Sequence, residues 1–104
     1  MAHEDDAGLV SDRFPRFAAE LADALRAAGE GRLADQVAGL RVVQECGCDD
    51  DFCRSFYTAP PPDGAYGPGH RCVTPTPERA GMFVLDVVDD EIMYVEALTR
   101  ARLD

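Results

Sequence analysis

Two apolar runs in the last quarter of the chain limit the fold most strongly. Residues 81–88 (Gly-Met-Phe-Val-Leu-Asp-Val-Val) and 92–98 (Ile-Met-Tyr-Val-Glu-Ala-Leu) are rich in β-branched and aromatic residues, and only three acidic residues separate them. Two such runs with so short a polar connection are typical of a β-hairpin. We therefore predict two antiparallel strands joined by a two-residue turn at Asp89-Asp90.

Alternation along this hairpin assigns its side chains to two faces. One face is predicted to pack on the helices, and it collects Phe83, Leu85, Val87, Ile92, Tyr94 and Leu98. The opposite face collects Met82, Val84, Val88, Met93, Val95 and Ala97 around Asp86. That face is unusually apolar for a surface, so we expect either the long loop or a second copy of the chain, in a homodimer, to cover it. In this register Asp86 and Glu96 point to opposite faces, which argues against an acid/base pair.

The first part of the chain predicts a tail followed by two helices. Residues 1–11 show no hydrophobic periodicity, so we expect a flexible tail before a single domain at 12–104. A long helix is predicted next, with Pro15 in its first turn and Gly29 after its end. Apolar residues recur along it at helical spacing, namely Phe14, Phe17, Leu21, Leu25 and Ala28. A shorter helix is predicted over residues 31–38.

The middle of the chain predicts a second hairpin and a long loop. Residues 40–45 and 53–58 favour strands, so residues 46–52 are expected at the hairpin tip. Residues 59–80 contain many prolines and glycines, and no regular element is expected there. The predicted fold class is therefore α+β, with one long and one short N-terminal helix on a four-stranded, mainly antiparallel sheet of two hairpins.

Three of the four cysteines, Cys46, Cys48 and Cys53, fall within eight residues at that hairpin tip. Residues two apart on an extended segment point to the same side, so Cys46 and Cys48 can converge on one ion, and the returning chain brings the sulfur of Cys53 back to it. We predict that this ion is Zn²⁺. A structural zinc site needs a fourth ligand, for which the long loop offers His70, with Cys72 as the alternative. We favour His70 because a neutral imidazole adds no negative charge beside three adjacent aspartates, and we expect the geometry to permit only one of the two.

Other residues of the long loop leave alternatives open. Free cysteines are often simply small buried hydrophobic residues, and His70 is equally explained as an exposed loop histidine. Tyr66, between Gly64 and Gly67, is either an anchor that packs the loop on the domain or a contact residue for a partner.

The motifs Cys-Gly-Cys, Cys-x-Ser-Phe-Tyr-Thr, Gly-Pro-Gly-His-Arg and Gly-x-x-Val-Leu-Asp-Val-Val occur in this order between residues 45 and 98. Together they resemble a group of small uncharacterised bacterial proteins with a cysteine-bearing hairpin. The resemblance implies a single α+β domain and transfers no activity. It also implies His70, an aspartate or water, rather than Cys72, as the fourth ligand.

The charge of the chain excludes several classes of function. Ten arginines, no lysine and twenty acidic residues leave a net charge of −10, which disfavours nucleic acids and anionic membranes as partners. The sequence contains neither a leader pattern nor an apolar run of the roughly 18 residues that a membrane span needs, so we expect a cytoplasmic protein.

No catalytic motif is recognisable, so we predict a binding function rather than an enzyme. The leading hypothesis is a small, acidic, zinc-type metal-binding module for protein interaction or regulation. One alternative is a thiol-redox protein in which Cys48 and Cys53 form a reversible disulfide. Another is a metal-free acidic binder of the immunity or antitoxin type, which rests on charge alone.

Overall fold

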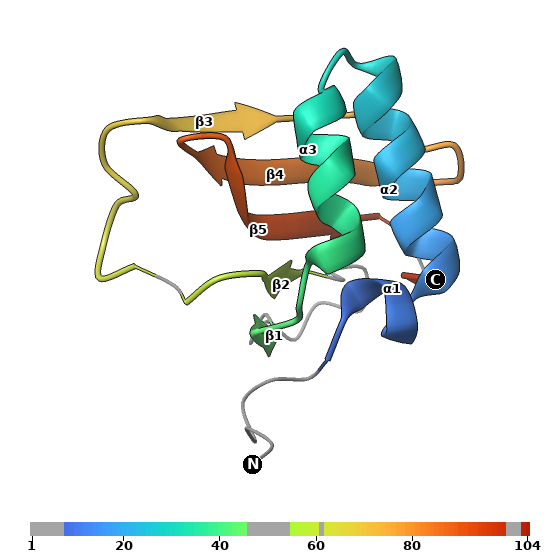
Figure 1. Cartoon of the computed structure of the whole chain (residues 1–104), viewed down its shortest axis with the longest axis horizontal. Coiled ribbons are helices and arrows are strands. Elements are labelled where there is room, and N and C mark those ends of the chain that lie inside the picture. Colours follow the sequence, from blue (N-terminus) through green and yellow to red (C-terminus); the bar gives the residue numbers. More distant parts are fainter. Residues whose placement is uncertain (1–7, 46–54, 61, 100–102) are drawn as a thin grey trace.

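The computed structural model describes residues 8–45, 55–60, 62–99 and 103–104, and it shows a layer of helices on one face of an antiparallel sheet (Figure 1). The helical elements are α1 (Val10–Arg13), α2 (Pro15–Ala27), α3 (Gly31–Gln36) and the 3₁₀ turn η1 (Val37–Gly39). The strands are β1 (Gln44–Glu45), β2 (Phe56–Tyr57), β3 (His70–Val73), β4 (Met82–Val88) and β5 (Glu91–Leu98). The predicted α+β class is confirmed, and none of the described helices is long and apolar enough to cross a membrane.

The two predicted helices are confirmed as α2 and α3. Pro15 occupies the first turn of α2, where its missing N–H costs no hydrogen bond, and Gly29 follows the helix with a positive φ of 82°. Phe17, Leu21 and Leu25 of the predicted apolar stripe are buried, Phe14 is partly buried against the core, and Ala28 is exposed just past the end of the helix. The Phe17 ring packs edge-on against Phe56 and Phe83, with centroids 6.0 and 5.4 Å away. Packing of this stripe on the strands forms the core of the domain.

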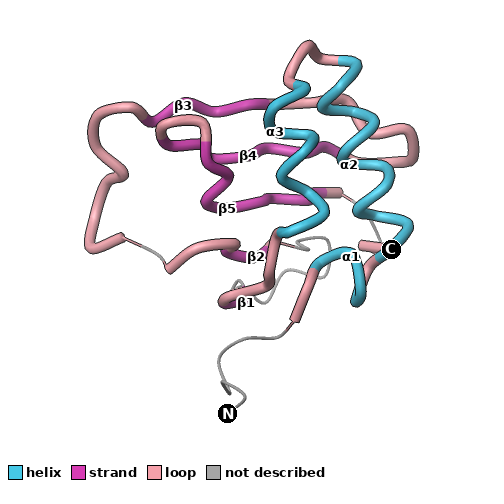
Figure 2. Tube along the Cα trace, in the orientation of Figure 1, coloured by secondary structure: helices cyan, strands magenta, loops and turns pink. Residues whose placement is uncertain are grey.

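The strand order is β1-β2-β5-β4-β3, and all neighbours are antiparallel (Figure 2). Both predicted hairpins are present, because β1 pairs with β2 and β4 pairs with β5. Strand β3 is an additional edge strand inside the segment predicted to lack regular structure. It escaped prediction because its four residues lie between Gly69 and Pro75, and because pairing with β4, rather than local propensity, makes it a strand.

The turn of the final hairpin matches the prediction of two residues. Asp89 and Asp90 both have positive φ, 50° and 67°, as a type I′ hairpin turn requires, and aspartate tolerates this conformation better than most side chains do. The turn therefore forms without the glycine that usually marks it.

A register shift in the final hairpin changes the predicted faces. Asp86 pairs with Tyr94 and Val87 pairs with Ile92, so Met93 is an extra residue in β5. A bulge of this kind reverses the alternation beyond it. The predicted faces are right for β4 and for Ile92, but they are wrong for residues 94–98 of β5. Five residues exchange faces: Val95 and Ala97 turn toward the helices, and Tyr94, Glu96 and Leu98 turn away.

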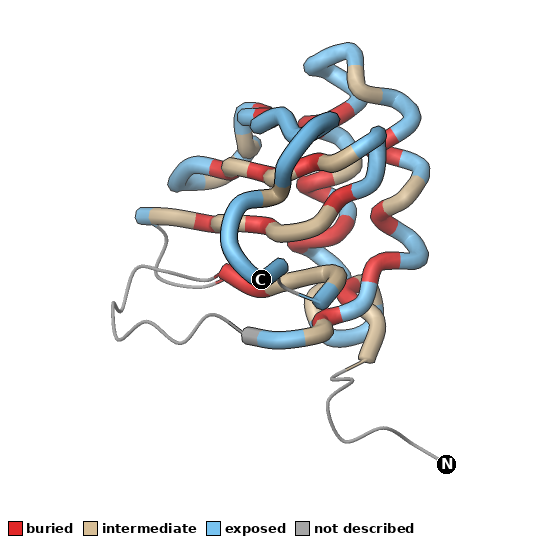
Figure 3. The backbone as a smooth tube through the Cα atoms, turned by 90° about the vertical axis from the view of Figure 1, so that its left-hand side faces the viewer, coloured by how far each residue is buried: buried red, intermediate tan, exposed pale blue. Residues whose placement is uncertain are grey.

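The bulge corrects two further predictions. Val95 and Ala97 are completely buried, so neither can contribute to a homodimer contact. Figure 3 shows how buried and partly buried residues alternate along the strands of the sheet. The homodimer itself stays a prediction, but its contact surface cannot include Val95 or Ala97. Asp86 and Glu96 lie on the same face of the sheet, not on opposite faces.

The predicted tail is too long. Leu9 forms a bridge with Arg41, the Val10 N–H donates to Leu40 O at 2.9 Å, and the Val10 side chain is completely buried. Residues 8–11 therefore belong to the domain, whereas residues 1–7 lie outside the described residues. So short a segment, fixed by backbone pairing, gives no periodic signal in the sequence.

Candidate metal site on the outer sheet face

The face of the sheet that points away from the helices, here called the outer face, carries the polar and aromatic side chains of the strands. Pairing places His70, Cys72, Asp86, Tyr57, Tyr94 and Glu96 on it. Next to these, Arg71 on β3 points the other way, and both its terminal nitrogens bond the Glu30 carboxylate at 3.0 and 3.1 Å. Its positive charge is therefore directed away from the outer face.

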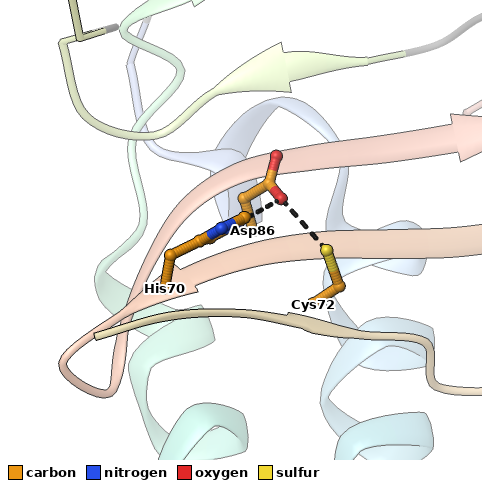
Figure 4. A group of neighbouring side chains, drawn as sticks. All are labelled: His70, Cys72 and Asp86. Carbon is orange, nitrogen blue, oxygen red and sulfur yellow. Dashed lines mark hydrogen bonds and ion pairs between the residues drawn. The ribbon is translucent and has the colours of Figure 1, made fainter. Parts of the chain in front are cut away.

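Three side chains of different chemistry converge on this face (Figure 4). Asp86 Oδ1 lies 2.8 Å from His70 Nε2 and 3.4 Å from Cys72 Sγ. The donor atoms of the three residues all lie within 4.8 Å of one another. A nitrogen, a sulfur and a carboxylate oxygen at this separation form a ligand set of the type that zinc accepts.

The secondary structure explains the convergence. His70 and Cys72 are two residues apart on β3, so their side chains point to the same side. Cys72 lies directly opposite Asp86 in the β3–β4 pairing, and the Asp86 carboxylate reaches both side chains. The backbone of two hydrogen-bonded strands therefore sets the geometry of all three ligands.

Cys72 is not an activated nucleophile in this arrangement. Its thiol donates to Asp86, which raises the pKa of Cys72, and burial and the negative charges of Asp86 and Glu96 raise it further. Reactive cysteines need the opposite environment, in which a neighbouring cation stabilises the thiolate. The cluster therefore favours binding a cation over covalent catalysis.

Glu96 adds a second carboxylate to the same face. Burial raises the pKa of Glu96, and the negative charge of Asp86 adds to this shift. The charge of Asp86 therefore disfavours ionisation of Glu96, and a bound cation would relieve that repulsion.

Tyr66 lies over the site from the loop that precedes β3. Its ring stacks on the His70 imidazole, with centroids 5.0 Å apart and planes 30° from parallel. Burial raises the pKa of Tyr66, with smaller contributions from Asp86 and Tyr57. Of the two predicted roles of Tyr66, this packing favours the anchor that holds the loop on the domain. The residue that Tyr66 packs on, His70, is a candidate ligand.

The predicted ligands have different outcomes. Cys46, Cys48 and Cys53 lie outside the described residues. His70 and Cys72 are brought together on one face, because the segment is a strand and not an irregular loop. The expectation that only one of them completes the set of Cys46, Cys48 and Cys53 stays a prediction. Asp86 was missed as a candidate ligand, because its proximity to them depends on pairing with β3.

Comparison with known proteins adds no relative: no family model, no curated protein and no solved structure matches the chain.

Proposed function

We propose that the protein is a small metal-binding module that takes up a zinc-type divalent ion through His70, Cys72 and Asp86. The observation that supports this most directly is the approach of three donor atoms of different elements to within 4.8 Å.

The hydrogen bonds within the cluster resemble the bonds that an ion would form. Zinc lies about 2.0–2.3 Å from nitrogen, oxygen and sulfur ligands, so tetrahedral ligand atoms lie roughly 3.3–3.8 Å apart. The observed separations of 2.8 and 3.4 Å from Asp86 need only a small opening. Binding would replace the thiol proton of Cys72 and use the free electron pair of one His70 nitrogen.

The charge of the site also suits a divalent cation. A Cys72 thiolate and the Asp86 carboxylate together neutralise two positive charges, while Glu96 supplies further negative potential nearby. A neutral His70 adds a ligand without adding charge.

Three protein ligands leave one coordination position for water or for a donor from another molecule. The His70 and Asp86 side chains are 31% and 21% exposed, so this position is accessible from solvent. We therefore propose an interaction or regulatory role with a protein partner, in the cytoplasm, where a reducing environment keeps Cys72 as a thiol. Cys46, Cys48 and Cys53 stay a predicted thiolate set that the described residues do not test.

Zinc affinity measured by competition with a chromophoric chelator tests the proposal. The background is the full chain with Cys46, Cys48 and Cys53 replaced by serine, so that Cys72 is the only thiol. We expect one equivalent of Zn²⁺ to bind. Loss of a residue that merely orients a ligand costs about 10–100-fold in affinity, so His70→Ala, Cys72→Ser and Asp86→Asn should each cost at least tenfold.

Two variants serve as matched controls for these losses. His3→Ala removes the other histidine, and Glu91→Gln removes an exposed acid opposite Val88 in the same hairpin. Both should bind zinc as the background does. Absence of binding in the background, or equal losses in the controls, would contradict the proposed site.

A further inference from the structure

We infer that Tyr66 is a positioning residue of the metal site, and that it couples occupancy of the site to the conformation of the loop at residues 62–69. This inference rests on the proposed function and extends it to the regulation of the same site. It starts from the stacking of Tyr66 on His70, which is a contact between a loop residue and a candidate ligand.

The loop is fixed at its base in a way that returns Tyr66 to the sheet. The His70 N–H donates to Gly67 O at 3.4 Å, and the Asp89 N–H donates to Gly69 O at 3.2 Å. Gly69 has a φ of 85°, and a Cβ at this position would collide with the Asp89 carboxylate. Both the positive φ and the nearby Asp89 carboxylate therefore favour glycine at residue 69.

Tyr66 differs from its neighbours in burial. Tyr66 is partly buried, whereas residues 62–65 and 67–69 are exposed. Within the described part of the loop, its ring is therefore the side chain that fixes the segment against the sheet. The conformation of the loop therefore depends on the sheet surface under that ring.

Two contacts restrain the imidazole of His70. The Tyr66 ring covers one face of the imidazole, and Asp86 bonds its Nε2 edge at 2.8 Å. The χ2 torsion of a histidine is otherwise broad, and His70 lies on an edge strand with solvent beside it. The stack therefore keeps Nε2 directed at the site, so less rotational freedom is lost when the ion binds. Restraining one side chain in advance is worth roughly three- to tenfold in affinity.

The coupling is reciprocal by thermodynamic linkage. If the stack increases metal affinity by a given factor, bound metal increases the stability of the stacked loop by the same factor. Metal binding would then reduce the motion of residues 62–69, which is a change that a protein partner can detect.

Zn²⁺ titrations of Tyr66 variants test the inference, with the full chain in which serine replaces Cys46, Cys48 and Cys53 as the parent protein. Tyr66→Ala should lower zinc affinity roughly three- to tenfold, whereas Tyr66→Phe, which retains the ring, should stay within about twofold. Ala65→Ser, at an exposed position in the same loop, is the matched control and should not differ from the parent protein. The melting temperature of each metal-free variant shows that a loss of affinity is not a loss of folding.

Tyrosine fluorescence gives an independent readout, because the chain has three tyrosines and no tryptophan. Zn²⁺ should change the emission of the parent protein, and Tyr66→Phe should lose most of this change while it still binds the ion. Equal affinity in Tyr66→Ala and the parent protein, or equal losses in the Phe and Ala variants, would overturn the inference alone. Failure of the parent protein to bind Zn²⁺ would overturn the proposed function as well.

Discussion

Replacing Val95 by alanine should destabilise the protein strongly, because the bulge at Met93 turns Val95 into the core. The side chain is completely buried in the core, and the change removes two methylene equivalents at about 0.8 kcal/mol each. The cavity left behind adds to this loss, so we expect a total of about 2–3 kcal/mol. That loss should lower the melting temperature by roughly 8–15 °C in a domain of this size.

Val84→Ala is the matched control for this prediction. Val84 is partly buried on the outer face, opposite Glu96, so the same chemical change should cost under about 1 kcal/mol. Urea denaturation followed by far-ultraviolet circular dichroism measures both free energies of unfolding. Equal losses in the two variants, or a larger loss for Val84→Ala, would show that β5 lacks the bulge and that Val95 faces outward.

Three further predictions concern the rest of the domain. Val10→Ala should lower the free energy of unfolding, measured by urea denaturation, by about 2 kcal/mol, because Val10 is buried. A loss near zero would mean that Val10 belongs to the tail and not to the core. Glu20→Gln should cost about 2–3 kcal/mol, since its almost fully buried carboxylate pairs with Arg79 at 2.7 Å; a neutral result would mean that the pair is not formed. The hydrogen bonds from Arg71 lower the pKa of Glu30, so this pair stabilises the fold above about pH 4.3 and the benefit disappears as the pH falls through the lowered pKa. The stability difference between the parent protein and Glu30→Gln should therefore shrink in acid, and a difference that grows in acid would refute this assignment.

Hydrophobic periodicity in the sequence correctly predicted the longer helices and strands. The apolar stripe of α2 and the β-rich runs of β4 and β5 are long enough to show their periods. Even the two-residue turn at Asp89-Asp90 followed from the spacing of these runs. The bulge did not follow from this spacing. An extra residue in β5 agrees with the apolar pattern only if Val95 and Ala97 face the helices, and only the folded structure shows that they do.

The candidate site depended on a contact that no local pattern contains. His70 and Cys72 were recognisable as candidate ligands from their residue types. Their arrangement was not predictable, because β3 becomes a strand through pairing with β4. Only that pairing brings Asp86 next to both residues. An edge strand four residues long, between a glycine and a proline, carries too little propensity to be recognised.

Zinc-edge X-ray absorption on the zinc-loaded chain with Cys46, Cys48 and Cys53 replaced by serine tests the central claim most directly. Coordination by His70, Cys72 and Asp86 predicts one sulfur at about 2.3 Å and nitrogen or oxygen ligands at about 2.0–2.2 Å, and Cys72→Ser should remove the sulfur. A zinc shell without sulfur before that replacement, or a chain that retains no zinc, would contradict the account.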